Sequence, residues 1–405
     1  MTRPPPGADA WGHSVAHDPV SGRVAIVGVG EAEHTKASGR SAHEIAGESV
    51  ARAIEDAGLR PEEVDGICFS GGMGPAFDAK AFHEHFGTGH AMFESPQGGG
   101  MVWAATVPSI AVEALRTGAA RHIVNVFAVS WASQRDEMVG GPGQFHAAER
   151  FKRNLEVPFG FFPQPVYFAS IARRHMHEYG TTAEQLGAIA VTCRRHANRH
   201  PGAIMRNKTL ELEQYLARPM LVDPLRVEDC CLISDGGGAY VMTTPERARD
   251  LRRPPVWVEG VGEGHAGSGA YWSQQGDFTA TPQVFSAPAA FEMAGIGPAD
   301  VDVLAVYDPF TIVTLMQVED MGFCPKGQGG AFVSGDGLFY AGGRLPTNTH
   351  GGLLSHAYVL GISHVVELVR QLRGEAACQV AGAEVAVYGG YTGAMASTLV
   401  LRRST

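Results

Sequence analysis

The sequence lacks the features that mark several classes of protein. No apolar run reaches the roughly 18–20 residues of a membrane span, and the N-terminus has no apolar stretch typical of a signal peptide. The six cysteines include no C-x-x-C pair, so neither a zinc ribbon nor a disulfide framework is predicted. No block of Lys and Arg is dense enough for a nucleic-acid footprint, and the formal net charge is −10. We therefore expect a cytoplasmic protein without a nucleic-acid or membrane partner.

What the chain contains fits a globular protein large enough for two packed cores. Of its 405 residues, 44% are hydrophobic and 18% are charged, which excludes disordered, collagen-like and coiled-coil classes. Glycine is abundant, with 52 residues. This number predicts many tight turns between strands and helices, and backbone that packs close to a ligand.

An internal repeat divides the chain into two similar halves. Residues 55–67 (EDAGLRPEEVDGI) match residues 292–304 (EMAGIGPADVDVL) at an offset of 237, and residues 114–129 resemble 371–390 at an offset of 257. In the first pair, a helix is predicted to end at glycine, proline begins a short turn, and an apolar strand follows. Helices that alternate with strands in this way predict an α/β fold with parallel sheets covered on both faces.

The domain organisation follows from this repeat. The first half is predicted to comprise residues 21–129 together with 226–250, and the second half residues 251–405. The polar, Arg/His-rich stretch of residues 130–225 is too long for a plain connection, so it predicts a cap or loop domain inserted over the site. Residues 1–20 are expected to form a flexible tail.

Several motifs mark a family resemblance. They are NTHGG at 348–352, DGGGA at 235–239, and the longer segments at 307–332 and 348–376. Together with the two repeated halves, these motifs resemble the thiolase superfamily, and more narrowly its sterol-carrier or lipid-transfer-protein branch. The resemblance covers the chain after about residue 20. It implies a thiolase fold, with two pseudo-repeated α/β halves in five layers (αβαβα) and an inserted cap.

The sequence departs from the condensing thiolases at their catalytic positions. Counting back from the ALRTG segment places the position of the family's nucleophilic cysteine at about Met101. The motifs place Tyr307 where the family has asparagine, Tyr358 where it has a histidine, and Val387 near its second cysteine. The offset of 257 also pairs Met101 with Tyr358, at two helix N-termini that face each other in such a fold. The resemblance therefore implies that acyl-enzyme chemistry is lost and that two tyrosines have entered the pocket.

A tyrosine pair suits proton transfer at oxygen, because a phenol with a pKa of about 10 can relay a proton from an alcohol and protonate a carbanion. Retro-aldol cleavage of a β-hydroxyacyl thioester needs these steps and no covalent intermediate. Aldolases of the same branch cleave steroid side chains in this way, with paired tyrosines, and leave a ring ketone. We therefore predict retro-aldol cleavage of a β-hydroxyacyl-CoA that releases a short acyl-CoA such as propionyl-CoA. The only cofactor expected is the CoA of the substrate, and the ring system and side-chain length stay open.

Five residues are predicted to carry the chemistry. Tyr307 and Tyr358 form the acid/base pair, Asp308 or His356 tunes one of them, and His350 contacts the thioester. Which tyrosine takes the first proton is open. Each assignment has a structural alternative: an aromatic residue at the end of a buried strand usually packs in the core, and an acid after a strand often caps the following helix. Tyr358 is expected just inside a helix, where His356 would diverge from it by roughly 200°.

The predicted substrate-binding residues lie in glycine-rich segments near the two helix starts and in the last strand loop: Gly98, Gly99, Gly100, Met101, Gly351, Gly352 and Tyr391. The three glycines before Met101 would let backbone amides approach the acyl group. No metal site is predicted, because His196 and His200, although four residues apart, lie in a basic stretch that disfavours a cation.

The resemblance also implies partners. Members of the branch form homodimers and commonly work with a separate protein built from a zinc ribbon and an OB-fold, often joined to a hydratase. Two other functions stay open. One is a thiolase-like acyl-CoA acyltransferase, against which Met101 argues. The other is a non-catalytic paralogue that binds acyl-CoA, which would not be expected to keep polar side chains at the replaced positions.

Overall fold

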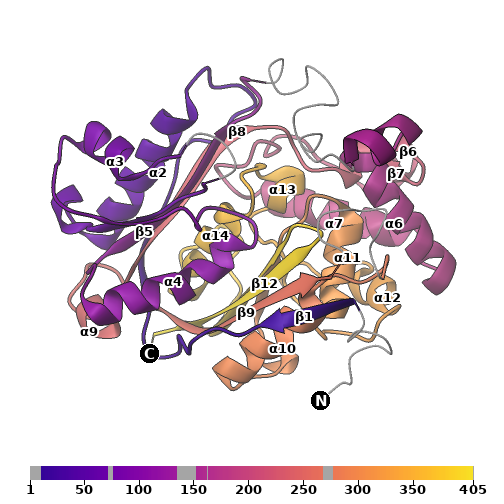
Figure 1. Ribbon diagram of the computed structural model, residues 1–405. Coiled ribbons are helices and arrows are strands. Elements are labelled where there is room, and N and C mark those ends of the chain that lie inside the picture. The colour runs from indigo at the N-terminus through magenta and orange to yellow at the C-terminus, as the bar shows by residue number, and fades with distance from the viewer. Residues whose placement is uncertain (1–10, 72–75, 135–151, 162, 268–276, 405) are drawn as a thin grey trace.

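The computed structural model describes residues 11–71, 76–134, 152–161, 163–267 and 277–404. Its principal element is a mixed sheet of ten strands in the order β10-β11-β12-β9-β2-β8-β5-β3-β4, with β1 paired to β9 (Figure 1). The strands are β1 (Gly12–Val15), β2 (Ala25–Glu31), β3 (Gly66–Cys68), β4 (Phe93–Ser95), β5 (Ile123–Ser130), β8 (Asp235–Thr243), β9 (Val256–Ala266), β10 (Val303–Val306), β11 (Val385–Tyr391) and β12 (Met395–Arg403).

The two halves have the same strand order. The first contributes β2-β8-β5-β3-β4 and the second contributes β9-β12-β11-β10, so that β2, β8, β5 and β3 correspond to β9, β12, β11 and β10. A parallel bridge between Leu304 and Thr347 stands where the first half has β4. The halves join through β2 and β9, which pair at Ala25–Trp257 and Ile26–Val256. The topology thus confirms the repeat that the sequence predicted.

The expectation of parallel sheets is correct for only part of each half. Strands β3, β4 and β5 are parallel, as are β10 and β11. Strands β8 and β12 run antiparallel to both of their neighbours. For β12 the reason is local, since a short connection after Tyr391 returns the chain directly beside β11. Each half therefore has a mixed sheet.

The helices form three layers around the two halves of the sheet (Figure 1). Helix α2 covers the outer face of the first half, α10 covers the outer face of the second, and α4 and α14 lie between the halves and contact strands of both. Every residue of α14 from Ile362 to Val369 is buried, as expected for a helix covered on all sides. The predicted five-layer arrangement is confirmed. These helices are α2 (Ala42–Ala57), α4 (Trp103–Thr117), α10 (Gln283–Ala294) and α14 (Ile362–Arg373).

The predicted helix ends and turns recur in both halves. Helix α2 ends at Gly58 (φ 74°) and α10 ends at Gly295 (φ 65°), and each glycine is in the left-handed conformation that favours this residue. A 3-10 turn that begins at proline follows in each half, at Pro61–Glu63 and Pro298–Asp300. These turns lead into β3 and β10.

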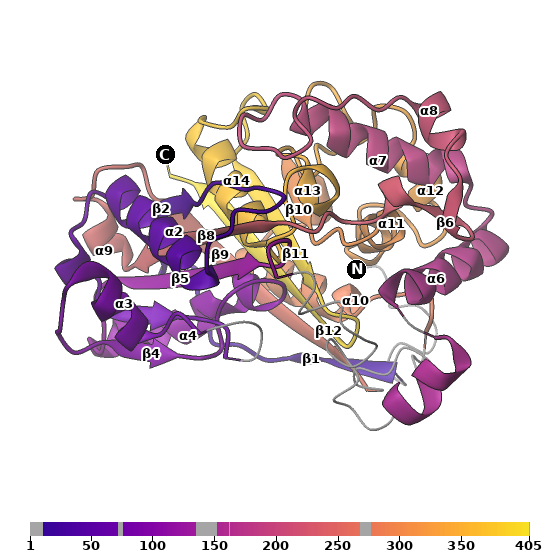
Figure 2. The ribbon, with the colours of Figure 1, turned by 90° about the horizontal axis from the view of Figure 1, so that it is seen from above.

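The insertion packs against the second half, as Figure 2 shows. Its helix α7 contacts α11, α12 and α13 of that half, and α6 contacts α11. The remaining elements are α3 (Ala79–Phe86), α6 (Gln164–Tyr179), α7 (Ala183–Ala197), α8 (Leu212–Leu216), β6 (Met220–Val222), β7 (Leu225–Arg226), α9 (Pro245–Ala248), α11 (Thr311–Asp320), α12 (Gly329–Val333) and α13 (Gly352–Ser355). The domain boundaries themselves remain a prediction.

The predicted tail over residues 1–20 needs a correction. Strand β1 lies within it and pairs with β9 from Gly12–Ala266 to Val15–Glu263, because the edge of β9 offers free backbone groups there. Residues 1–10 lie outside the described residues.

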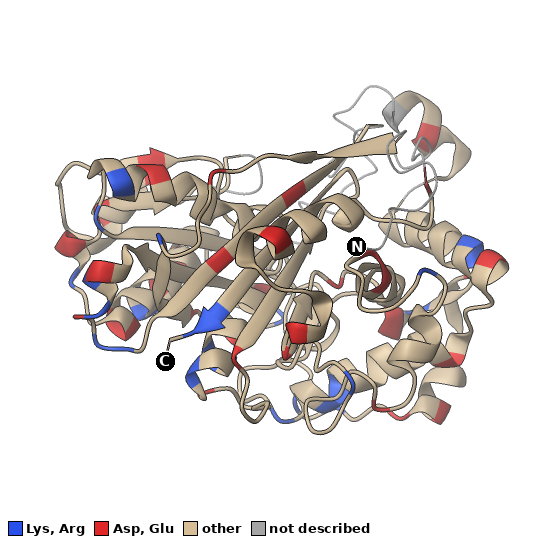
Figure 3. Cartoon of the chain, turned by 90° about the horizontal axis from the view of Figure 1, so that it is seen from below, with Lys and Arg blue, Asp and Glu red and all other residues tan. Residues whose placement is uncertain are grey.

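Two further observations concern the surface. Acidic and basic residues are interspersed over the helices and connections that the structure describes (Figure 3). Within the same residues, no helix combines the length and the apolar character that crossing a bilayer requires.

Candidate active site

Tyr307 is held at the end of strand β10 by its backbone. Its N–H donates to the Gly389 carbonyl of β11 at 2.8 Å, and its carbonyl accepts from Gln317 Nε2 at 2.8 Å. Both groups belong to buried parts of the second half. The backbone of Tyr307 is therefore held by the sheet and by helix α11, which sets the point from which its side chain extends.

Asn348, the first residue of the NTHGG motif, clamps the residue before Tyr307. Its Oδ1 accepts from the Val306 N–H at 2.8 Å, and its Nδ2 donates to the Val306 carbonyl at 3.0 Å. Asn348 itself has φ of 50°, a left-handed conformation that asparagine tolerates better than most residues. The motif thus positions the end of β10, and with it Tyr307.

Tyr358 lies in the connection between α13 and α14, so the expectation that it begins a helix is wrong. Its N–H donates to Ser234 Oγ at 2.9 Å, and the same hydroxyl donates to the Tyr358 carbonyl at 3.2 Å. Its ring packs against Trp131 with a centroid distance of 4.8 Å. This tyrosine of the second half is therefore held by Trp131, at the start of the insertion, and by Ser234 of the first half.

The structure brings the two predicted tyrosines together. Their hydroxyl oxygens lie 3.0 Å apart, and either can be the donor. Burial raises the pKa of Tyr307 well above its ordinary value, and the neighbouring Tyr358 hydroxyl adds to this effect. Burial also raises the pKa of Tyr358. Both side chains are therefore neutral phenols near pH 7, joined in a hydrogen bond through which a proton can pass.

Cys231 is a neighbour of this pair that the sequence did not point to. Its thiol interacts electrostatically with both hydroxyls, and its backbone N–H donates to the carbonyl of Pro309, two residues after Tyr307. Burial raises the pKa of the Cys231 thiol well above its ordinary value. Because the thiolate is the nucleophilic form, this environment makes Cys231 unreactive.

The starts of helices α4 and α14 touch, as predicted, but their register differs from the prediction. Met101 lies two residues before the first residue of α4 and has φ of 52°, and Leu360 lies two residues before α14 with φ of 49°. The Met101 N–H donates to the Leu360 carbonyl. Leu360, and not Tyr358, is therefore the counterpart of Met101. Tyr358 lies two residues earlier, because α14, with 12 residues, is shorter than α4, with 15 residues, so an offset taken near the helix ends does not hold at the helix starts.

The glycines before Met101 serve this contact between the halves. The Gly98 N–H donates to the Phe69 carbonyl at 2.9 Å, and the Gly99 N–H donates to Asn125 Oδ1 at 2.7 Å. A Cβ atom on Gly100 would lie 2.4 Å from the Leu360 carbonyl oxygen. The prediction that these amides approach the acyl group is therefore wrong for Gly98 and Gly99, whose donors are used within the protein.

Asp308 makes no hydrogen bond to either tyrosine hydroxyl among the described residues. Its Oδ1 accepts from the Leu353 N–H at 2.8 Å and lies 3.0 Å from His364 Nε2. All three groups are buried. Asp308 was predicted to tune one of the tyrosines, but its contacts give it a structural role. It fixes the start of α13 and orients a histidine of α14.

His350 and His356 lie in a cluster of buried imidazole rings that meet edge to face. Ring centroids are 4.9 Å apart between His356 and His350, and 4.6 Å apart between His350 and His364. Within the described chain, no hydrogen bond joins His350 or His356 to Tyr307 or Tyr358. The structure therefore does not bring these two predicted residues to the tyrosine hydroxyls.

The remaining predicted residues are buried near the site. Tyr391 is the last residue of β11 and is 4% exposed. A Cβ on Gly351 would contact Ala197 of α7, and a Cβ on Gly352 would lie 2.0 Å from Asp308 Oδ2. Both glycines have positive φ, of 112° and 62°. They allow α13 to pack closely, and whether they also contact a substrate remains a prediction.

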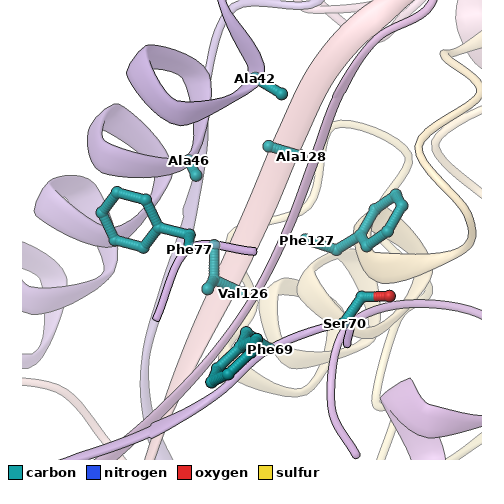
Figure 4. A pocket seen from close by; sticks show the side chains of 8 residues that line it. All are labelled: Ala42, Ala46, Phe69, Ser70, Phe77, Val126, Phe127 and Ala128. Carbon is teal, nitrogen blue, oxygen red and sulfur yellow. The ribbon is translucent and has the colours of Figure 1, made fainter. Parts of the chain in front are cut away.

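A small cavity of about 10 Å³ lies between α2 and β5, and its lining includes neither tyrosine of the pair (Figure 4). Most of the side chains around it are apolar, which excludes it as a site of acid/base chemistry. Its lining consists of Ala42, Ala46, Phe69, Ser70, Phe77, Val126, Phe127 and Ala128.

Comparison with known proteins finds similarity over most of the chain. A family model described as "Thiolase C-terminal domain-like" matches residues 264–403. A "Steroid side-chain-cleaving aldolase" of Thermomonospora curvata is 36% identical over 394 residues, 94% of this chain and 98% of that protein. A "17-hydroxy-3-oxo-4-pregnene-20-carboxyl-CoA lyase" of Mycobacterium tuberculosis is 36% identical over 395 residues, 94% of this chain and all of that protein.

Among solved structures, one described as "Ltp2-ChsH2(DUF35) aldolase" superposes with a TM-score of 0.85 at 34% identity. The match covers 95% of this chain and 99% of that chain. The similarity therefore extends through both halves and the insertion.

Proposed function

Because this chain belongs to the thiolase superfamily, in the group that contains the steroid side-chain-cleaving aldolases, we propose that it is an aldolase of thiolase fold that acts on acyl-CoA thioesters. The reaction is the retro-aldol cleavage of a β-hydroxyacyl-CoA on a steroid side chain. The products are a short acyl-CoA, such as propionyl-CoA, and a steroid ketone. CoA enters as part of the substrate.

The pair of hydroxyls 3.0 Å apart is the observation that carries this proposal. Retro-aldol cleavage breaks one C–C bond and moves one proton, from the β-hydroxyl oxygen to the α-carbon of the leaving acyl group. Two neutral phenols in contact match this requirement. One accepts the hydroxyl proton while its own proton passes to the second, which protonates the α-carbon. The pair ends the cycle in its starting state, and either direction of transfer is compatible with the geometry.

Burial of the tyrosines favours this relay over a free phenolate. The raised pKa values of Tyr307 and Tyr358 make each phenol a weak acid in isolation. A phenol that loses its proton only as it gains another avoids a charged intermediate in the buried site. The relay therefore explains why two adjacent tyrosines are needed in place of one.

The acyltransferase alternative requires a nucleophile that the described residues do not supply. Met101 stands before α4 at the left-handed turn, and the nearby Cys231 is kept protonated by burial. A non-catalytic acyl-CoA-binding role would not account for two hydroxyls placed within hydrogen-bond distance. Neither alternative is favoured by a specific observation.

A product assay tests the proposal. The protein is incubated with 17-hydroxy-3-oxo-4-pregnene-20-carboxyl-CoA, the compound named for the mycobacterial relative, and the mixture is analysed by mass spectrometry. We expect propionyl-CoA and a steroid ketone in equal amounts, with no mass added to the protein. A covalent acyl adduct would favour the acyltransferase, and absence of both products with a range of β-hydroxyacyl-CoA thioesters would contradict the proposal.

We further propose that the enzyme works as a homodimer with a second protein. The solved relative is described as a complex that includes ChsH2(DUF35). A partner with a zinc ribbon and an OB-fold, often joined to a hydratase, is what the resemblance implies. Purification of this chain with and without such a partner tests this point. Higher specific activity of a co-purified complex is expected, and equal activity would argue against a partner.

A further inference from the structure

A pocket of about 690 Å³ lies at the end of strand β2, and its lining includes neither tyrosine of the pair. Its walls include Glu31, His34, His200, His356 and Arg370. These residues come from the first half, the insertion and the second half, so only the folded chain brings them together. The proposed function does not use this pocket.

Three of these side chains converge on one point. Glu31, His34 and His356 each offer one potential ligand atom, and the three atoms lie within 4.8 Å of one another. The distance from Glu31 Oε1 to His34 Nε2 is 3.9 Å. Glu31 is 8% exposed, His34 is 9% exposed and His356 is fully buried.

The converging atoms have no hydrogen-bond partner within the described protein. They are Glu31 Oε1, His34 Nε2 and both ring nitrogens of His356. Buried polar groups left in this state destabilise a fold, so a ligand or ordered water is expected there. Three unpartnered groups aimed at one point favour a ligand that accepts several lone pairs.

The surrounding contacts hold the first two side chains in this orientation. The His34 ring has a hydrogen bond with the backbone of Gly237, which leaves Nε2 to face the pocket. Glu31 Oε2 accepts from Arg370 Nη1 at 2.5 Å, which leaves Oε1 to face His34. Ligating histidines almost always bond through the other ring nitrogen to a carbonyl or carboxylate group, and ligating carboxylates are themselves hydrogen-bonded.

The protonation states suit a cation. Burial lowers the pKa values of His34 and His356, so both rings are neutral near pH 7 and keep a free lone pair. Burial opposes ionisation of Glu31, but the charge of Arg370 and its hydrogen bond to this carboxyl favour ionisation, and the pKa of Glu31 is lowered. The cluster thus presents two neutral imidazoles and one carboxylate.

We propose that Glu31, His34 and His356 bind a divalent transition-metal ion of the zinc and cobalt class, with water from the pocket completing the coordination. Two nitrogens and one oxygen suit these ions, whereas Mg²⁺ and Ca²⁺ take oxygen ligands. Bonds of about 2.1 Å require the ligand atoms to close by about 1 Å, within reach of side-chain rotation. The positive charge of Arg370 beside Glu31 opposes the cation, so binding weaker than at a structural zinc site is expected.

Cobalt binding tests the site without reference to activity. The full-length protein is stripped with a chelator and titrated with Co²⁺, which is followed by its visible absorption and by calorimetry. The wild type should bind one ion per chain, and Zn²⁺ should displace it. The variants His34→Ala and His356→Ala should each bind at least tenfold more weakly, while His177→Ala, which changes an exposed histidine of α6, should match the wild type.

The outcomes separate the possibilities. Absence of stoichiometric Co²⁺ binding by the wild type, or equal binding by the wild type and both site variants, overturns the proposal. If His356→Ala fails to fold, His34→Ala at the pocket wall decides the question alone. Circular dichroism of every variant establishes that a loss of binding is not a loss of structure.

Discussion

The hydroxyl oxygens of Tyr307 and Tyr358 lie 3.0 Å apart, although 51 positions separate the two residues in the chain. One hydroxyl is presented by the end of a buried strand, and the other by the connection before the central helix α14. The contact therefore depends on the packing of the middle layer against the sheet.

Removal of either hydroxyl should slow turnover strongly. In Tyr307→Phe and in Tyr358→Phe, the proton path has lost one member, and we expect kcat to fall at least tenfold in each variant. The double variant should be little worse than either single one, because the two groups act as a unit. Steady-state kinetics with a β-hydroxyacyl-CoA measure this. Tyr179→Phe, on an exposed residue of α6, is the control, and rates near the wild type in both site variants would refute the relay.

The thiol of Cys231 should contribute little to the reaction. Because burial keeps it protonated, Cys231→Ala should change kcat by less than about threefold, the effect of a small change in packing near the tyrosines. Intact-mass spectrometry of the wild type during turnover should show no acyl group on the protein. A large loss of activity together with an adduct at Cys231 would instead support covalent catalysis.

Asn348 should prove necessary for the position of Tyr307. The variant Asn348→Ala loses both hydrogen bonds to Val306 and places alanine at a φ of 50°. We expect the free energy of unfolding to fall by about 2–3 kcal/mol. Urea denaturation measures this change, and the kcat of the folded variant should fall as well.

Asn348→Gly separates the two causes. Glycine adopts the left-handed conformation without strain but still lacks the side-chain hydrogen bonds. It should therefore recover part of the stability and none of the kcat. Full activity in Asn348→Gly would show that the clamp on Val306 is not required.

The buried carboxyl of Glu367 should make stability depend on pH. Burial raises its pKa to about 7, from an ordinary value of 4.5. The folded state then binds more protons than the unfolded state between these values, so the free energy of unfolding should fall as pH rises from about 4.5 to 7 and level off above. The full effect is about 3 kcal/mol.

Glu367→Gln should reduce this dependence. Its amide oxygen can still accept from Thr349 Oγ1, which lies 2.6 Å from Glu367 Oε1 in the wild type. Urea denaturation at pH 5 and pH 8 measures the slope, with the exposed Glu292→Gln as the control. An unchanged slope in Glu367→Gln would exclude this carboxyl as the source.

Much of the fold follows from short-range sequence signals. The repeated segments predicted helix ends at Gly58 and Gly295 because a left-handed glycine followed by proline ends a helix independently of distant contacts. The antiparallel direction of β8 and β12 is different in kind. The direction of these two strands depends on how the chain returns to the sheet. The pattern of residues within a strand carries no information about that direction.

The tyrosine pair was predictable because both residues occupy motif positions, and motif positions correspond to places in the fold. The hydrogen-bond partners of the surrounding groups could not be predicted from the sequence. The amides of Gly98 and Gly99 are used by Phe69 and Asn125, residues that are distant in the chain. Cys231 reaches the pair from a third segment, where no local pattern distinguishes it from a core cysteine.

The same distinction applies to the register of the two helix starts. An offset derived from the ends of matching helices assumes that the two helices have equal lengths, and α4 is longer than α14. The left-handed residues Met101 and Leu360 show where the two halves correspond. Their left-handed conformation is a property of the backbone, and neither methionine nor leucine indicates it in the sequence.

Strand β2 of the first half and strand β9 of the second are hydrogen-bonded neighbours, which makes the two sheets one continuous surface. Hinge bending between the halves would break these bonds and separate the central helices from strands of one half. The proposed steroid substrate would then enter a site between two joined halves. We therefore expect that, among enzymes of this architecture, the segments around the joined halves determine the size of the substrate that each enzyme accepts.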